Sequence, residues 1–241
     1  ASEKSPLHQS ISVLQHSHRF DSKQALGRLA KSVQMGDAEN VIEILSGNDP
    51  AIQWIGRDGG AEAQEGALTC IVNGYDAYRQ TLDEAPNGSI EAIEQFDQFR
   101  VLCVHHSGWP GDVSMNRLAA QRLAEARGEI LSDGNYLGRP VMVQKNDYRL
   151  GLFNGDTGLL VGEGEGSGYD VLFDCPSEDG GTRRVPASMI QGLTDAYAMT
   201  IHKSQGSEFH QVLILLPDQD PGILSRELLY TAITRVCDAW D

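Results

Sequence analysis

AMTIHKSQGSEF, residues 198–209, is an apolar segment that changes abruptly into a run of polar residues. Residues 196–201 are apolar and strand-like, and the next seven are largely polar. A second apolar segment, QVLILLP at 211–217, and the helical pattern SRELLYTAITRV at 225–236 come after it. Strands that alternate with helices predict a parallel sheet of the α/β class, which binds ligands at the carboxyl ends of its strands.

The region before this segment is mainly helical in its pattern. Apolar residues recur at helical spacing in residues 22–33, for which Asp21 or Ser22 is the expected N-cap, and Ser89 is expected to cap a later helix. FRVLCV at 99–104 is short and apolar, which indicates a buried strand, and the turn-rich stretch HHSGWPGD follows it. A helix is expected from about 114 to 127.

The pattern changes near residue 137 to short β-rich pieces separated by turns. Four such pieces predict a small antiparallel sheet or barrel, inserted into the α/β domain. GLFNGDTG at 151–158 is interpreted as a turn between strands. GEGEGSG at 162–168 is interpreted in the same way and not as a phosphate-binding loop, because its glutamates would repel phosphate. The expected organisation is therefore 1–137 and 192–241 as two parts of one domain, with 138–191 as the insert.

Composition limits the classes of function. The 241 residues carry a net charge of −15, which is unusual for a nucleic-acid binder and calls for a local cationic surface or partner subunits. No long apolar run indicates a membrane span and no signal peptide is evident, so a cytoplasmic location is expected. The four cysteines lie far apart and form no CxxC pair, which argues against a zinc site, and no other metal site is predicted.

The polar residues of 198–209 suit phosphates and sugars. Thr200 and Ser204 offer hydroxyls, His202 and Lys203 offer cations or donors, and Gly206 permits close approach of a ligand. The alternative is a polar loop from strand to helix with Ser204 or Ser207 as an N-cap.

Two arginines also admit two interpretations. Arg19, in SHRFD at 17–21, could bind a phosphate bidentately or form a surface ion pair. Arg235 lies near the end of a helix, where it could compensate the helix dipole or act as an arginine finger. No GxxxxGK[ST] phosphate-binding loop occurs in the sequence, so the chain cannot by itself hold the β- and γ-phosphates of a nucleotide.

Four stretches together resemble the second motor domain of RecD-type superfamily 1 (SF1B) DNA helicases, a family that includes the alpha subunit of exodeoxyribonuclease V (RecBCD). They are SHRFD, GRPVMVQKNDYRLGLFNGDTG at 138–158, AMTIHKSQGSEF and RELLYTAITR at 226–235. The resemblance implies a RecA-like fold, a parallel sheet flanked by helices, with an SH3-like barrel as the insert. It covers nearly the whole chain.

The resemblance also implies roles for single residues. Arg19 matches the arginine of motif IV and Arg235 the arginine finger of motif VI, where Tyr230 and Thr231 also match. His18 stands near the expected adenine, Gln205 and Gly206 near the γ-phosphate, and Glu208 near the ribose. The residues that would approach single-stranded DNA are Thr200, His202, Lys203 and Ser204.

The implied activity is ATP-dependent 5′-to-3′ helicase movement, with Mg²⁺, in the RecBCD complex of DNA repair and recombination. ATP would lie between this domain and an N-terminal RecA-like domain of the same protein, with RecB and RecC as partner subunits. The 241 residues are thus expected to be a fragment that neither hydrolyses ATP nor unwinds DNA alone. The alternatives are a stand-alone RecD-like helicase, a relaxase-helicase, or a protein-binding module built on the SH3-like insert.

Overall fold

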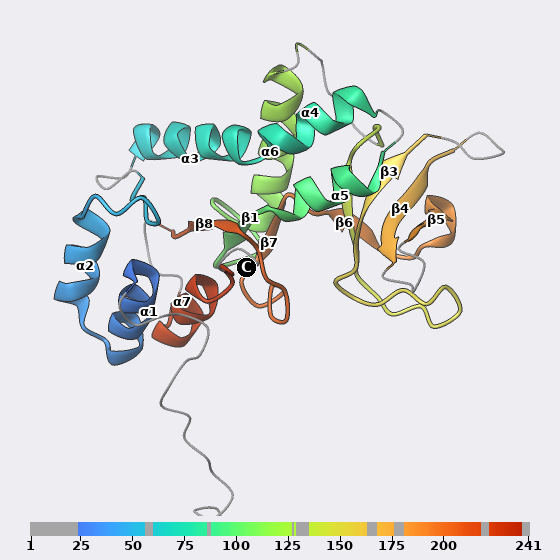
Figure 1. Cartoon of the computed structure of the whole chain (residues 1–241). Coiled ribbons are helices and arrows are strands. Elements are labelled where there is room, and N and C mark those ends of the chain that lie inside the picture. Colours follow the sequence, from blue (N-terminus) through green and yellow to red (C-terminus); the bar gives the residue numbers. More distant parts are fainter. Residues whose placement is uncertain are drawn as a thin grey trace, which may run out of the picture. The chain divides into compact units, whose positions relative to one another are not determined.

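The computed structural model describes residues 24–55, 60–85, 88–126, 128, 135–162, 168–175, 181–217 and 222–237. The chain divides into two compact units, Ala1–Gln53 and Trp54–Asp241. The described part of the first unit is a pair of helices, α1 (Ala25–Met35) and α2 (Ala38–Ser46) (Figure 1).

The turn between α1 and α2 follows from Gly36 and Asp37. Gly36 ends α1 in the left-handed conformation, at φ 73°, and the Asp37 side chain accepts a hydrogen bond from the Asn40 amide at 3.1 Å to begin α2. The prediction that Asp21 or Ser22 caps this helix is wrong, because α1 begins at Ala25 and its N-cap is Gln24, whose side chain makes no capping bond.

Three parallel strands form the sheet of the second unit, in the order β7 (Ala198–Thr200), β1 (Phe99–Cys103), β8 (Gln211–Leu215). Cys103 is the register partner of both Thr200 and Leu215, so the three strands end at one edge. The α/β class and the strand that leads into the polar segment are therefore confirmed.

Helices pack around this sheet (Figure 1). Helix α3 (Gly60–Gly74) contacts β1 and β8, α6 (Asp112–Ala126) contacts β7, and α7 (Arg226–Ile233) contacts β8. Helices α4 (Asp76–Glu84) and α5 (Ile90–Asp97) lie between α3 and β1 in the sequence. Ser89 caps α5 as expected, because its hydroxyl accepts a hydrogen bond from the Ala92 amide at 3.1 Å.

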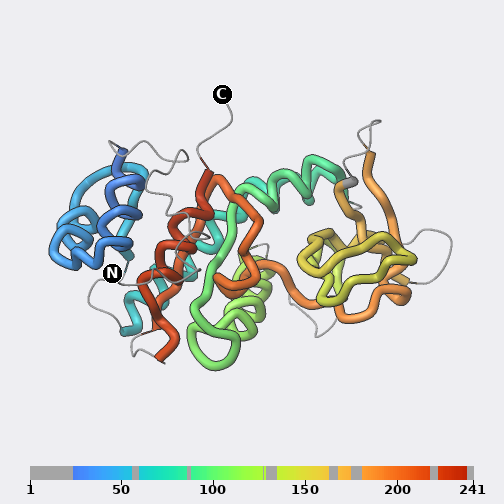
Figure 2. Tube along the Cα trace, turned by 90° about the horizontal axis from the view of Figure 1, so that it is seen from below, coloured from blue at the N-terminus to red at the C-terminus, as the bar shows by residue number. Residues whose placement is uncertain are grey.

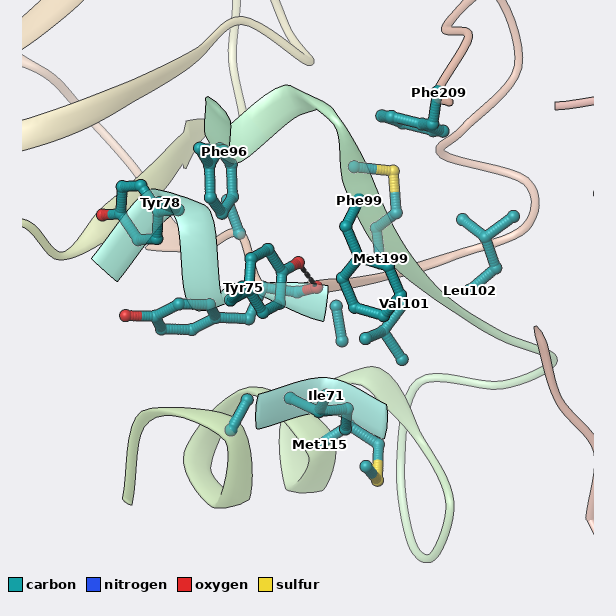
Figure 3. Close-up of a cluster of buried hydrophobic side chains, with 14 of the residues drawn as sticks. Ile71, Tyr75, Tyr78, Phe96, Phe99, Val101, Leu102, Met115, Met199 and Phe209 are labelled. Carbon is teal, nitrogen blue, oxygen red and sulfur yellow. Dashed lines mark hydrogen bonds between the residues drawn. The ribbon is translucent and has the colours of Figure 1, made fainter. Parts of the chain in front are cut away.

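An aromatic cluster fills the core on one side of β1 (Figure 3). The ring of Tyr75 stacks on that of Phe96 at 5.5 Å between centroids and meets the ring of Phe99 edge-on at 4.9 Å. The Tyr75 hydroxyl donates to the carbonyl of Tyr197 at 2.6 Å, which is the dashed line in Figure 3. This bond joins the residue between α3 and α4 to the residue that precedes β7, and so fixes the strand that leads into the polar segment.

Burial makes several tyrosine hydroxyls hard to ionise. It raises the pKa of Tyr75 and Tyr197 well above the usual value, and it raises the pKa of Tyr136 to about 12. The unfolded chain releases these protons near pH 10, whereas the folded chain keeps them. The stability that these tyrosines contribute is therefore complete below about pH 10 and is lost as the pH rises toward the folded-state values.

We expect the free energy of unfolding to fall above pH 10 by up to about 1.4 kcal/mol per pH unit for each of these tyrosines. Urea unfolding is followed by circular dichroism at several pH values from about 9 to about 11.5, a range that spans the ordinary tyrosine pKa. The slope of the free energy of unfolding against pH is then compared between variants. Tyr75→Phe should reduce the slope, and Tyr148→Phe, at a side chain 79% exposed, should leave it unchanged. Ionisation of all tyrosines near pH 10, without unfolding, would contradict the expectation.

The β-rich insert is a five-stranded antiparallel sheet in the order β5 (Gly181–Pro186), β4 (Asp170–Cys175), β3 (Thr157–Val161), β2 (Pro140–Val143), β6 (Leu193–Asp195). The antiparallel sheet is confirmed, but the described strands form an open sheet with β5 and β6 at its edges, and no closed barrel is seen among them. Strand β6 also extends the sheet past residue 191, the boundary expected from the sequence.

Alternate residues of this sheet serve two cores. Leu159 and Val161 join the main core, whereas Leu160 joins a smaller cluster with Val143 and Val171. Figure 2 shows these strands, in yellow and orange, as a group of their own in the second unit. A bridge between Asp147 and Leu152 and positive φ angles at two glycines confirm turns in 151–158, and residues 163–167 of the other expected turn lie outside the described part.

Candidate nucleotide and nucleic-acid interface

The polar residues after β7 form a compact series of turns over 201–206, and the described residues 201–210 contain no helix that Ser204 or Ser207 could cap. The Ile201 amide donates to the carbonyl of Cys103 at 2.9 Å, and the Ser204 amide donates to the carbonyl of Thr200 at 3.2 Å. Gly206 has a φ of 92°, a conformation that favours glycine, and the chain then continues toward β8.

This turn exposes some predicted ligand residues and buries another. His202, Lys203, Gln205, Gly206 and Glu208 are exposed, and Thr200 is half-buried. Ser204 is fully buried, and its hydroxyl donates to the carbonyl of Ile201 at 2.8 Å. Ser204 therefore stabilises the turn, and this geometry gives no support to the DNA contact predicted for it.

Arg235 lies directly against the turn. Its Nη1 atom donates to the carbonyl of Ser207 at 3.1 Å and to that of Ser204 at 3.4 Å, while Nε donates to the carbonyl of Thr231 at 3.2 Å. The last bond is to a carbonyl near the end of α7, as expected of a cation that compensates the helix dipole. The guanidinium thus connects α7 with the segment that contains Gln205 and Gly206.

The main chain joins the same two segments. Phe209 forms a parallel bridge with Val236, in which the Phe209 amide donates to the carbonyl of Arg235 at 2.8 Å and the Cys237 amide donates to the carbonyl of Phe209 at 2.9 Å. Two sequence segments that resemble different helicase motifs are therefore brought together here. Tyr230 and Thr231 are half-buried on α7, and the Thr231 hydroxyl donates to the carbonyl of Glu227 at 2.7 Å.

Asp112, which the sequence did not indicate as a ligand residue, lies against the turn and also contacts His106. The carboxylate of Asp112, at the start of α6, lies 3.7 Å from the Nζ atom of Lys203 and 2.6 Å from the Nδ1 atom of His106. The stretch HHSGWPGD was interpreted only as a turn. The position of this stretch directly after β1, the strand next to β7, is the feature that could have indicated a site here.

Asn116 fixes the strand that carries the turn. Its side-chain amide donates to the carbonyl of Ala198 at 2.8 Å, and its side-chain oxygen accepts from the Ala198 amide at 2.9 Å. Asn116 is buried, so both bonds are shielded from water. Helix α6 and β7 are thereby held in one register, which sets where the turn begins.

Two residues of the expected nucleotide site, His18 and Arg19, lie outside the described residues. Among the described residues, no group of histidine, cysteine, aspartate and glutamate side chains has the arrangement of a metal site. In the same part of the chain, no helix is long and apolar enough to cross a membrane.

Residues 195–236, which contain this turn and α7, match the model of the UvrD-like helicase C-terminal domain. The whole chain is similar to the RecBCD enzyme subunit RecD of Mycolicibacterium smegmatis, at 35% identity over 225 residues, 93% of this chain and 38% of the relative. The corresponding subunit of Haemophilus influenzae is 30% identical over 248 residues, 95% of this chain and 37% of the relative. The chain thus spans less than two fifths of the length of these curated relatives.

A further relative is the ATP-dependent RecD2 DNA helicase of Deinococcus radiodurans, 38% identical over 101 residues, which are 42% of this chain and 13% of the relative. Among solved structures, that of the Bacteroides Pif1 helicase in complex with ADP-AlF3 and ssDNA is 20% identical, with a TM-score of 0.38, over 71% of this chain and 47% of that one. The α/β part of the chain has the helicase-like RecA-type fold, and the chain belongs to the RecD-type family of superfamily 1 DNA helicases.

Proposed function

We propose that this chain supplies half of the ATP site and part of the single-stranded DNA track of an ATP-dependent 5′-to-3′ DNA helicase. The observation that carries the proposal is the contact of the Arg235 guanidinium with the carbonyls of Ser204 and Ser207. Through it, one turn contacts a cation suited to nucleotide phosphates and also carries the exposed side chains of His202 and Lys203.

The chemistry of the residues fits half of a nucleotide site. A guanidinium can neutralise charge that develops on a transferring phosphoryl group, and the exposed Gln205 and Gly206 can donate hydrogen bonds to phosphate oxygens. Glu208 is exposed beside them and suits a ribose hydroxyl. ATP and Mg²⁺ would be held mainly by another motor domain, because this sequence has no phosphate-binding loop and its described residues offer no metal site.

The proposed partners are that motor domain, single-stranded DNA, and RecB and RecC subunits, as in the RecBCD complex. Support comes from the relatives of the chain, which are RecBCD enzyme subunits. The insert is proposed to be the counterpart of the SH3-like subdomain of this family, on the strength of its small antiparallel sheet between the two parts of the α/β domain.

The ATP half-site has a direct test in the purified 241-residue chain. We expect no ATP hydrolysis above background, with or without oligonucleotide, because no residue group here can hold the β- and γ-phosphates. A coupled assay of phosphate release measures this. Turnover by the chain alone would contradict the half-site.

The DNA track is tested by binding of fluorescein-labelled oligo(dT) to the same chain, followed by fluorescence anisotropy. We expect Lys203→Ala to weaken binding and to reduce the slope of log K against log [salt] by about 1, since one phosphate contact is lost. His202→Ala should weaken binding at all salt concentrations. The control is Arg117→Ala, another exposed cation, on α6, and an effect as large in this variant would argue against a local track.

A second candidate function, a protein-docking module, is favoured by one observation. Tyr148 and Phe153, on the connection between β2 and β3, are 79% and 50% exposed and meet edge to face at 6.2 Å. Exposed aromatic pairs are common in protein interfaces. A chain that binds no oligo(dT), but binds the RecB and RecC subunits in a way that the variant Tyr148→Ser, Phe153→Ser loses, would favour the protein-docking module.

A further inference from the structure

The loop between β1 and α6, residues 104–111, leaves the parallel sheet beside the polar turn. Strands β1 and β7 are neighbours in parallel register, with Cys103 opposite Thr200. The Ile201 amide donates to the carbonyl of Cys103, so the two chain segments are still bonded where they leave the sheet. Any strand of DNA that lies along the turn 201–206 therefore passes next to this loop.

The loop is held in one shape by its own hydrogen bonds. The Ser114 hydroxyl donates to the carbonyl of Gly108 at 2.6 Å, and the Asp112 amide donates to the carbonyl of His105 at 3.1 Å. A Cβ atom on Gly111 would come within 2.6 Å of the carbonyl oxygen of His106, so only glycine fits there. This fixed loop presents Trp109, which is 38% exposed although tryptophan is costly to leave in water.

The carboxylate of Asp112 connects the loop with the turn. Its side chain is only 5% exposed, and its two oxygens lie 2.6 Å from the Nδ1 atom of His106 and 3.7 Å from the Nζ atom of Lys203. The side chains of His106 and Lys203 are 63% and 39% exposed, so the two groups remain accessible while one buried carboxylate holds them. The loop that carries Trp109 thus lies at the same carboxyl edge of the sheet as the turn that carries Lys203.

We infer that the loop 104–111 is a second contact for single-stranded DNA, in which Trp109 stacks on a base and Asp112 is a positioning residue for His106 and Lys203. The inference rests on the proposed function. Aromatic side chains bind the faces of unpaired bases, and neighbouring cations bind the phosphates between them. The chain as a whole has a net charge of −15, which repels DNA. A surface that offers an aromatic ring and nitrogen donors, and whose carboxylate is buried, suits single-stranded DNA better than the rest of such a chain.

Trp109→Ala tests the stacking contact in the oligo(dT) titration. We expect affinity to fall by about five- to 100-fold, the range that loss of one stacked base corresponds to, with an unchanged salt slope because no charge is removed. Trp109→Phe should recover part of the loss. Trp54→Ala is the matched control, since Trp54 is also 38% exposed, and it should bind as the unchanged chain does.

A chain whose other tryptophans are replaced, Trp54→Phe and Trp240→Phe, gives a direct readout of the same contact. Its emission comes from Trp109 alone among the three tryptophans of the sequence, and stacking on thymine should quench it during the titration. Full affinity in Trp109→Ala, or emission that oligo(dT) leaves unchanged, would overturn the inference.

Asp112→Asn separates positioning from simple electrostatics. Removal of a negative charge near phosphates alone would tighten binding, whereas loss of the group that holds His106 and Lys203 should weaken it by about threefold or more. Tighter binding in Asp112→Asn would overturn the positioning role. If Lys203→Ala weakens binding and Trp109→Ala does not, the inference fails and the proposed function stands, and no binding by the unchanged chain would contradict both.

Discussion

Replacing Arg235 with alanine is expected to lower ATP turnover by about a thousandfold or more, in a RecD-type protein that contains these 241 residues together with a phosphate-binding motor domain. In the proposed finger role, the guanidinium acts on charge that develops as the phosphoryl group is transferred. Its loss should therefore reduce kcat much more than nucleotide affinity. Steady-state ATPase kinetics and the Kd of a fluorescent ATP analogue measure the two effects separately.

The structure requires a control for this experiment, because Arg235 also bonds to the carbonyls of Ser204 and Ser207. Arg235→Lys keeps the charge but loses the planar fork of donors, so it should recover little turnover. Both variants should retain binding of oligo(dT) and an unfolding midpoint close to that of the unchanged protein. A kcat that stays within about twofold in Arg235→Ala would rule out the finger role.

Replacing Arg100 with alanine is expected to lower the free energy of unfolding by about 3–5 kcal/mol, a large part of the stability of an ordinary domain. Arg100 lies within β1 and is 1% exposed. Its Nη1 atom donates to the carbonyl of Ala196 at 2.6 Å and its Nη2 atom donates to Asp97 at 2.6 Å. The guanidinium also lies 4.0 Å from the centre of the Phe96 ring.

Several losses add up in this variant. The carbonyl of Ala196 is left without its charged donor, the carboxylate of Asp97 loses its partner, and a cavity opens beside Phe96. Urea unfolding of the 241-residue chain, followed by circular dichroism, measures the change. The double variant Arg100→Met, Asp97→Ala should be more stable than Arg100→Ala, because it fills the space and removes the unpaired carboxylate. A loss below about 1 kcal/mol would show that the buried guanidinium and its bonds contribute little.

Local pattern was enough to predict much of the fold. The apolar segments 99–104 and 211–217 are strands in the structure, and the helix expected from about 114 to 127 is α6. These elements depend on the periodicity of neighbouring residues, which a sequence displays directly. The same holds for Ser89, since a helix cap involves residues only three positions apart.

Features that depend on distant segments could not be predicted in this way. Arg100 lies in an otherwise apolar strand, and its burial is intelligible only with the carbonyl of Ala196 beside it. The Asp112 carboxylate reaches Lys203 only because β1 and β7 are neighbours, and no pattern within either segment predicts this pairing of strands. Burial of Ser204 likewise depends on how the turn packs, whereas its residue type suggested an exposed ligand.

The proposed site likewise contains residues that local sequence motifs could indicate and residues that depend on distant segments. Sequence motifs named the exposed residues of the turn and Arg235, and the structure brings them together. The roles of these residues toward nucleotide and DNA stay predictions, as do those of His18 and Arg19. The contacts proposed for Trp109 and His106 could not be assigned from sequence, because they depend on the position of their loop beside the turn that follows β7.

The pairing of Asn116 with Ala198 has a consequence for how the chain behaves in concentrated solution. Strand β7 is at an edge of the parallel sheet formed by the described strands, and unpaired edge groups are the usual template for strand addition and aggregation. One side-chain amide already occupies the outward amide and carbonyl of Ala198. A buried polar side chain thereby protects a short edge against self-association, which a hydrophobic side chain at this position could not do, because it has neither donor nor acceptor for these two groups.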